Sequence, residues 1–315
     1  MEERKKERKK VSMRELHRAY GESENIIQLL NEGNSDEFNQ VNKMKYIEIA
    51  YDLQAGSYVQ AMKDPIHALL KRKKCVEMAE IVEEYISSPK SFLKAGVGEA
   101  VTLVPFLDAY KHNIESVYGF DISWSRISHA KGFLEENSYN KVKLCTGTLQ
   151  QIPFVDDSFE VIMTSHACEP NGGYEKVILN ELKRVSSNIV ALFEPGYEFA
   201  NKEGQERMNK HGYVKGLPEI AVELGFKILY HAPLKTSVRP ENPTAALILQ
   251  VPNVEKNIRN PVYACPITKK KLLKYGNGYF SNESYLYYPS INNMPTLREE
   301  NGILASHIYE EVLND

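Results

Sequence analysis

Residues 91–103 read SFLKAGVGEAVTL, a short apolar stretch that runs into two glycines and then into a helical pattern. A buried strand, a glycine turn and a helix in this order form the loop that binds nucleotide-like cofactors in open α/β sheets. Gly96 and Gly98 let the backbone approach a ligand without a Cβ in the way, although Gly-x-Gly also marks an ordinary tight turn. Two positions are unusual, because Lys94 replaces the acid common in this loop and Ala100 stands where a third glycine often falls.

Short apolar runs alternate with helical patterns from residue 91 onward. Seven runs predict strands: SFLKAG, SVYGFD, VKLCTG, FEVIMTSHA, NIVALFEP, KILYHAPL and TAALILQV. The sequence therefore predicts an α/β fold, a Rossmann-like, doubly wound, mostly parallel seven-stranded sheet whose last two strands form an antiparallel edge pair. We expect this sheet at residues 89–252, after an N-terminal helical region at 1–88 and before a small β-rich module at 253–315.

Composition and charge narrow the class of protein. The 315 residues are 42% hydrophobic, and a net charge of -3 does not favour a nucleic-acid partner. The start MEERKKERKK lacks the apolar core of a secretory signal, and no apolar run reaches the ~18 residues of a membrane span. We expect a cytoplasmic protein without membrane contact. For its basic first ten residues we expect a solvated tail, with contact to RNA or to a membrane surface as the alternative. No disulfide or metal site is expected from the spacing of Cys75, Cys145, Cys168 and Cys265.

Asp121 ends the second predicted strand, 25 residues after Gly96. A carboxylate there can accept hydrogen bonds from both hydroxyls of a ribose. Alternatively, it caps the N-terminus of the following helix. Val101 occupies the third glycine position of a dinucleotide-binding GxGxxG, which argues against a nicotinamide oxidoreductase.

Residues 145–167, CTGTLQQIPFVDDSFEVIMTSHA, contain a specific pattern. Class I S-adenosylmethionine-dependent methyltransferases have here a Gly-Asp-Ala turn, then Leu-Pro-Phe, then Asp-x-Ser-Phe-Asp before an apolar strand. The chain has Gly147-Thr148-Leu149, Ile152-Pro153-Phe154 and Asp157-Ser158-Phe159-Glu160. With FLKAGVGEA and VYGFD it resembles this family, of the methyltransferase-11 type, over about residues 85–200.

The resemblance implies S-adenosylmethionine as cofactor and a role for each matching residue. Gly96 and Gly98 would pass under the methionine part, and Asp121 would hold the ribose hydroxyls. Ile122 would lie against the adenine ring, to which Leu149 would give its backbone N–H.

Two further positions follow from the same resemblance. Thr148 stands where the family has an acid for the adenine amino group, and its hydroxyl would accept a weaker bond. YDLQAGSY at 51–58 resembles an N-terminal helix that covers the cofactor. On a helix over residues 46–60, Tyr51 and Tyr58 lie on one face, toward the cofactor or packed against the core.

Methyl transfer needs alignment, and a base when the acceptor carries a proton. Candidate bases are His166, Glu169 and His211, with Glu194 at the end of the fifth strand as another. His166 is the first choice, because histidine titrates near neutrality and this one would face the reacting methyl group. Alternatively, His166 shapes its loop by hydrogen bonding, and Glu169 and Asn171 orient the acceptor.

The expected acceptor is a small polar or glycan-like molecule, methylated at oxygen or nitrogen. The Asn/Asp-Pro-Pro-Tyr signature of base amino-group methylation is absent, and EPNG at 169–172 does not replace it. RMNKHGYVKGLPE at 207–219 is either an acceptor-side lid or a basic surface loop. The oligomeric state, including a homo-oligomer, is left open.

The C-terminal segment has a resemblance of its own. Tyr263-Ala-Cys-Pro, a following Lys-x-x-Leu, Tyr288-Pro289 and Met294-Pro295 are similar to the small zinc-binding partner protein of translation-related methyltransferases. Thr268 replaces the second cysteine of that family's Cys-Pro-x-Cys, and no later cysteine follows. We expect a metal-free copy that stabilises the catalytic domain or recognises the acceptor.

A second function stays open beside the methyltransferase, namely a catalytically silent methyltransferase-like scaffold. Lys94 and Thr148 motivate it, because each replaces a usual acid. Near the cofactor's amino group a lysine would repel a cation, so we expect Lys94 to turn toward Glu99, Glu194 or the cofactor carboxylate.

Overall fold

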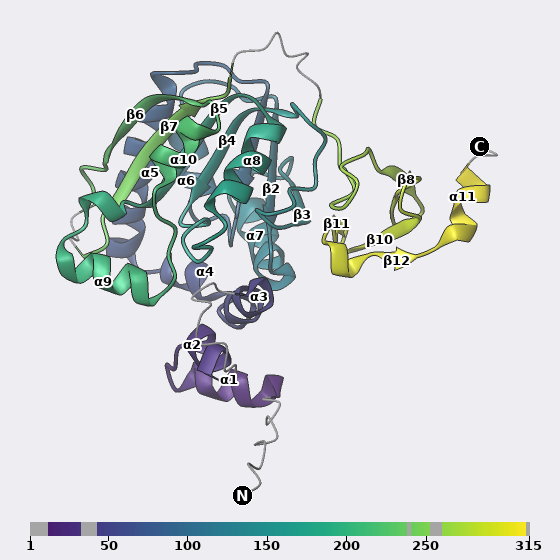
Figure 1. Cartoon of the computed structure of the whole chain (residues 1–315), viewed down its shortest axis with the longest axis horizontal. Coiled ribbons are helices and arrows are strands. Elements are labelled where there is room, and N and C mark those ends of the chain that lie inside the picture. Colours follow the sequence, from purple (N-terminus) through teal and green to yellow (C-terminus); the bar gives the residue numbers. More distant parts are fainter. Residues whose placement is uncertain (1–11, 33–42, 238–240, 253–259, 313–315) are drawn as a thin grey trace, which may run out of the picture.

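The computed structural model describes residues 12–32, 43–237, 241–252 and 260–312. Seven strands form one sheet in the order β3-β2-β1-β4-β5-β7-β6 (Figure 1). The strands from β3 to β5 are parallel, whereas β7 runs antiparallel to both β5 and β6. The predicted fold class is confirmed. The strand bounds are β1 (Ser91–Ala95), β2 (Ser116–Asp121), β3 (Lys143–Thr146), β4 (Phe159–Ser165), β5 (Ser186–Pro195), β6 (Lys227–Pro233) and β7 (Thr244–Gln250).

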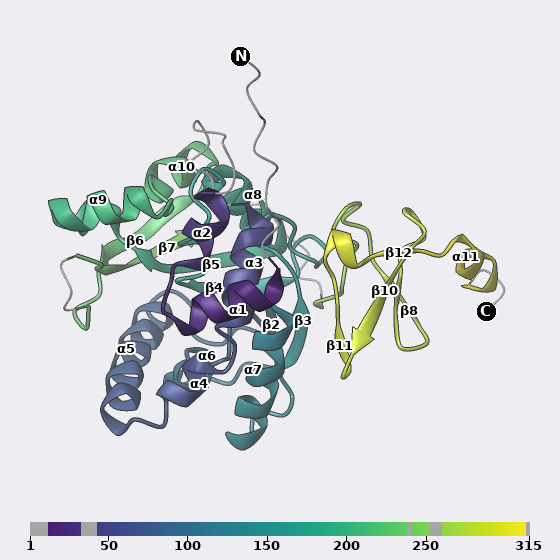
Figure 2. The ribbon, with the colours of Figure 1, turned by 90° about the horizontal axis from the view of Figure 1, so that it is seen from below.

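Helices cover both faces of this sheet (Figure 2). On one face lie α5 (Pro65–Glu83), α6 (Leu103–Ala109) and α7 (Trp124–Glu136), and on the other α8 (Glu175–Val185) and α10 (Leu217–Glu223). The short helix η1 (Tyr197–Phe199) and α9 (Lys202–Lys210) follow β5.

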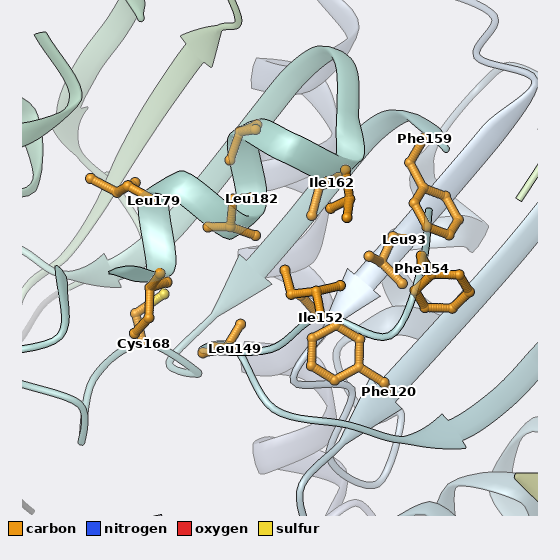
Figure 3. Packing of buried hydrophobic residues seen from close by; sticks show 14 of the residues in the cluster. Leu93, Phe120, Leu149, Ile152, Phe154, Phe159, Ile162, Cys168, Leu179 and Leu182 are labelled. Carbon is orange, nitrogen blue, oxygen red and sulfur yellow. The ribbon is translucent and has the colours of Figure 1, made fainter. Parts of the chain in front are cut away.

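Helix α8 shows why the helices pack against the faces of the sheet. Ile178, Leu179, Leu182 and Val185 recur at the spacing of one helical face and are buried in a single cluster. Figure 3 shows Leu179 and Leu182 in this cluster beside Ile162 of β4. Burying each such side chain contributes about 1.5–3 kcal/mol to folding, before the cost of ordering the chain.

The N-terminal region contains α1 (Met13–Gly21), α2 (Ile26–Glu32), α3 (Met44–Leu53) and α4 (Ser57–Ala61). The prediction of one helix over residues 46–60 is wrong, because Gly56 adopts φ 93° and separates α3 from α4. The Glu99 carboxylate fixes this break by accepting the backbone N–H groups of Gly56 (3.0 Å) and Val59 (2.7 Å). A carboxylate from the sheet domain therefore caps α4.

The C-terminal module stands at the β3 edge of the sheet (Figures 1 and 2). It comprises β8 (Leu273–Tyr275), β9 (Gly278–Phe280), β10 (Leu286–Ile291), β11 (Met294–Pro295), η2 (Glu299–Asn301), β12 (Ile303–Leu304) and α11 (Ser306–Val312). Cys265, Tyr288 and Leu297 belong to the same buried cluster as α8, so module and sheet share one core. The division of the chain at residues 88 and 252 into three parts remains a prediction. The basic residues 1–10 and the start of the module at 253–259 lie outside the described residues.

Arg298 links this module to the rest of the protein. Its side chain is only 3% exposed and lies 2.6 Å from the carboxylate of Glu48 on α3. It also donates to the backbone carbonyl of Ile122, directly after β2 (3.2 Å). The module therefore helps to hold the end of β2 in place.

In the described ranges, no helix has both the length and the apolar character to cross a membrane. Within the same ranges, no group of three His, Cys, Asp or Glu side chains is arranged to hold a metal ion. The thiol of Cys265 lies 3.5 Å from the hydroxyls of Ser284 and Tyr288. Hydrogen bonds thus surround the cysteine that begins the motif of the zinc-binding resemblance.

Candidate active site

A cavity of about 380 Å³ opens where β1, β2, β3 and β4 end. This is the edge at which an open parallel sheet binds its ligand. Two predicted residues, His211 and Glu194, do not line it. The predicted residues that do are Tyr51, Tyr58, Gly96, Gly98, Asp121, Ile122, Thr148, Leu149, His166, Glu169 and Asn171.

The turn after β1 requires its glycines. Gly96 and Gly98 have φ of 65° and 55°, and a Cβ on Gly96 would lie 2.3 Å from the Cβ of Ala167. A Cβ on Gly98 would lie 2.9 Å from Nη2 of Arg126. Ala100 also has a positive φ, 62°. The helix that follows the turn starts only at Leu103, because these left-handed residues interrupt the helical backbone.

The carboxylate of Asp121 is 6% exposed and connects the turns after β1 and β2. One oxygen accepts the N–H of Gly98 (2.8 Å) and the other that of Ser123 (3.1 Å). The alternative that Asp121 caps the next helix is wrong, because Ser123 is the N-cap and its hydroxyl accepts the N–H of Arg126. Each carboxylate oxygen keeps further lone pairs for a ligand in the cavity.

Ile122 and Leu149 line the same cavity as Asp121 and give it apolar surface. Thr148 lines this cavity as well. Its hydroxyl accepts the backbone N–H of Gln151 (3.2 Å), which closes the turn after β3.

Arg126 of α7 forms a cluster that the sequence did not indicate. Its guanidinium lies over the rings of Tyr51 (5.1 Å) and Tyr58 (4.8 Å), and 3.9 Å from the carboxylate of Glu99. Cation–π and ionic contacts of this kind hold a guanidinium rigidly. Both tyrosines thus share a cation beside the glycine turn, although they belong to different helices.

His166 and Glu169 form a pair at the end of β4. Nδ1 of His166 lies 2.5 Å from the Glu169 carboxylate, and its Nε2 lies 2.9 Å from the hydroxyl of Thr244. A carboxylate only accepts, so Nδ1 carries the proton of the neutral ring and Nε2 is the accepting nitrogen. Burial would raise the pKa of Glu169, but the hydrogen bond from His166 brings that pKa below its ordinary value. This is the arrangement of a carboxylate that orients a base.

Glu194 holds the loop that carries this pair. It is 2% exposed, and its two carboxylate oxygens accept the N–H groups of Ala167 and Glu169, each at 3.1 Å. Burial raises its pKa. Glu194 therefore positions the loop after β4 rather than facing an acceptor.

His211 lies in a neighbouring cavity together with Tyr51 and Tyr213. Burial lowers its pKa, and the nearby cation Arg207 adds to the effect. The segment 207–219 that contains it is hydrogen-bonded to the loop after β4, by Val214 to the carbonyl of Glu169 (3.1 Å) among others.

Comparison with known proteins bears on the central part of the chain. Residues 92–188 match the model of a methyltransferase domain. This match supports a class I methyltransferase. A search of the curated proteins found no match.

Several solved structures are similar to this chain. One is magnesium protoporphyrin IX methyltransferase (ChlM) from Synechocystis PCC 6803 with bound SAH, 15% identical with a TM-score of 0.50, covering 66% of this chain and 100% of that chain. A second is a complex of the Haloferax volcanii Trm112 methyltransferase activator with a methyltransferase. It is 12% identical with a TM-score of 0.48, covering 63% of this chain and 97% of that chain. A third is a SAM-dependent methyltransferase from Aquifex aeolicus. It is 16% identical with a TM-score of 0.47, covering 62% of this chain and 97% of that chain. The domain match agrees with the cofactor that the sequence predicts.

Lys94 is the unusual residue of the glycine turn. It is 1% exposed, and its ammonium donates to the backbone carbonyls of Gly96 (3.0 Å) and Ala95 (3.3 Å). The hydrogen bonds thus go to its own turn rather than to Glu99 or Glu194. Burial lowers the pKa of Lys94 to about 8, against the opposing influence of Glu194 and Asp121.

We expect Lys94→Met to make the protein more stable at pH 7, by on the order of 2 kcal/mol. Lys94 has a lower pKa in the folded than in the unfolded chain, so the folded state is penalised while the side chain is charged. That penalty is complete below pH 8 and disappears as the pH rises toward 10.5. The difference in free energy of unfolding between variant and wild type should therefore shrink over this range in urea titrations. A variant less stable than wild type by the same amount at every pH would contradict this account.

Proposed function

We propose that this protein transfers a methyl group from S-adenosylmethionine to a small polar acceptor, at an oxygen or nitrogen atom. The observation that carries the proposal is one cavity in which a glycine turn and a buried carboxylate lie beside a histidine–glutamate pair. The domain match over residues 92–188 supports it.

The residues present fit this cofactor. The turn after β1 has no room for a Cβ at Gly96, because Ala167 packs against it there. Both glycines line the cavity, so their backbone is open to a ligand. We assign the ribose hydroxyls to Asp121, the adenine ring to Ile122 and the backbone N–H of Leu149, and the methionine part to the turn at Gly96 and Gly98. The Thr148 hydroxyl accepts one N–H, from Gln151, and we assign its second lone pair to the adenine amino group.

When bound, S-adenosylmethionine supplies an electrophilic methyl group on a sulfonium sulfur. The side chains of the cavity would align the acceptor atom and take up its proton while that atom replaces the sulfonium sulfur on the methyl carbon and S-adenosylhomocysteine leaves. Nε2 of His166 receives this proton, because it is the accepting nitrogen of the ring. Glu169 stabilises the resulting imidazolium through the proton on Nδ1.

The protein would act in a reducing compartment such as the cytoplasm, because all four of its cysteines are free and buried.

Calorimetric titration with S-adenosylmethionine and S-adenosylhomocysteine tests the proposal. We expect saturable binding of both at one site. If neither binds, the proposal is wrong. If both bind but no acceptor is methylated, the silent scaffold replaces the enzyme as the better account.

A further inference from the structure

Two lysines of α5 point into the cavity from outside the methyltransferase motifs. Lys71 and Lys74 both line it, while Arg72 and Lys73 between them are exposed to solvent. Residues three apart on a helix share a face, so the two ammonium groups approach the cavity together. Lys71 donates to the hydroxyl of Thr102 (3.4 Å).

Neither lysine has an anionic partner of its own. Within the described part of the chain, the hydrogen bonds of Lys74 go to the Thr244 hydroxyl (2.8 Å) and to Nε2 of His166 (3.3 Å). No ion pair joins Lys71 or Lys74 to a carboxylate there. The three acids that line the cavity are engaged elsewhere: Glu99 by Gly56, Val59 and Arg126, Asp121 by Gly98 and Ser123, and Glu169 by His166.

Burial makes this arrangement costly for an empty site. It lowers the pKa of Lys74 to about 8, with repulsion from Lys71 as the second cause, and it also lowers the pKa of Lys71. An anion between the two ammonium groups would supply a countercharge and raise the pKa of both lysines again. The charges of Glu169 and Glu194 oppose the effect on Lys74, but no ion pair joins either carboxylate to it in the described part of the chain. The site thus has the electrostatics of an anion-binding site.

The position of the pair separates it from the cofactor's own carboxylate. Arg126 and Lys94 both lie at the glycine turn, so these two cations are the ones at the assigned methionine part. Lys74, by contrast, contacts the nitrogen of His166 that is assigned to receive the acceptor's proton. An anion held by the lysines would lie beside the atom that gains the methyl group.

We propose that Lys71 and Lys74 bind a phosphate or carboxylate group of the methyl acceptor, which is therefore a small anionic molecule. This inference rests on the proposed function, because it takes His166 to mark the acceptor side of the cavity. It narrows the acceptor from any small polar compound to an acid, and it gives α5 a role in substrate recognition.

The test uses the full chain saturated with S-adenosylhomocysteine and titrated with inorganic phosphate or acetate, at an ionic strength kept constant with chloride. We expect saturable binding of at least one of the two anions in the millimolar range. Lys71→Met and Lys74→Met should each weaken it at least tenfold, and Lys73→Met, from the exposed side of the same helix, less than twofold. Tighter phosphate binding would indicate a phosphorylated acceptor, and tighter acetate binding a carboxylated one.

Three results would overturn the inference. The first is that neither anion binds, and the second is that the two methionine variants bind phosphate as well as Lys73→Met does. The third is that these variants lose tenfold or more in affinity for S-adenosylhomocysteine, which would assign the lysines to the cofactor carboxylate. Failure of the proposed function looks different, because wild type would then bind no S-adenosylhomocysteine in the absence of any anion. Thermal melts of each variant exclude misfolding, and Lys74→Gln provides a second, polar replacement.

Discussion

His166→Ala is expected to lower kcat for methyl transfer about 10²- to 10⁴-fold, the range that a positioned general base contributes. The imidazole nitrogen Nε2 is the atom assigned to take the acceptor's proton, and no other ring nitrogen of the predicted bases lies in the cavity. Affinity for S-adenosylhomocysteine should change little, because the assigned cofactor contacts lie at Asp121, Ile122 and Leu149. The measurement is formation of S-adenosylhomocysteine with the best acceptor from a screen of small phosphorylated and carboxylated compounds.

Two companion variants separate the roles of the candidate bases. Glu169→Gln keeps a hydrogen-bonding side chain but removes the charge that stabilises the imidazolium, so it should reduce kcat about tenfold or more. His211→Ala should change kcat less than threefold, because His211 lies in the neighbouring cavity. Full activity of His166→Ala combined with a large loss in His211→Ala would reverse the assignment.

The sheet and the place of the site could be predicted because both follow from local sequence patterns. A buried strand such as β4 reads as an apolar run, and strands alternating with helices in this way form a parallel sheet. In such a sheet the residues that follow the strands meet at one edge. Sequence order is therefore enough to bring Gly96, Asp121 and His166 to one cavity.

The charges that complete the cavity could not be predicted, because they depend on how distant elements pack. Residues 71–74 read KRKK, and four consecutive cations do not indicate which of them face inward. The burial of Cys75 and Met78 sets the rotation of α5 and so selects Lys71 and Lys74. The bond between Glu99 and Gly56 joins residues 43 apart, and no local pattern marks it.

Alternatives at single residues were also decided by backbone detail. Asp121 and Ser123 are both good N-cap residues, so the sequence leaves the choice between them open. The backbone brings Ser123 into the capping position and leaves Asp121 facing the glycine turn. The sequence alone therefore does not tell which of the two caps the helix and which is free to bind a ligand. The folded turn after β2 decides this.

Asp121→Ala should weaken binding of S-adenosylhomocysteine by about 1–3 kcal/mol, or about 5- to 150-fold in Kd. Two causes act together. The variant loses the charge-assisted bonds assigned to the ribose hydroxyls, and it frees the N–H groups of Gly98 and Ser123 that hold the two turns in place. Calorimetric titration measures the first effect, and a thermal melt of the unliganded variant measures the second.

Asp121→Asn distinguishes these causes, because an amide oxygen can still accept one of the two backbone N–H groups while the charge is gone. If the ribose assignment is right, Asp121→Asn should lose much of the affinity while it melts close to wild type. Asp156→Ala is the matched control, since this exposed aspartate pairs with Arg184 and does not line the cavity. Unchanged affinity in Asp121→Ala would refute the ribose role. If only Asp121→Ala loses affinity, and it loses stability as well, while Asp121→Asn keeps both, then Asp121 acts only as a brace, a residue that holds the glycine turn in place. Because a brace and a ligand predict different behaviour for the asparagine variant, the pair of substitutions decides which role this carboxylate has.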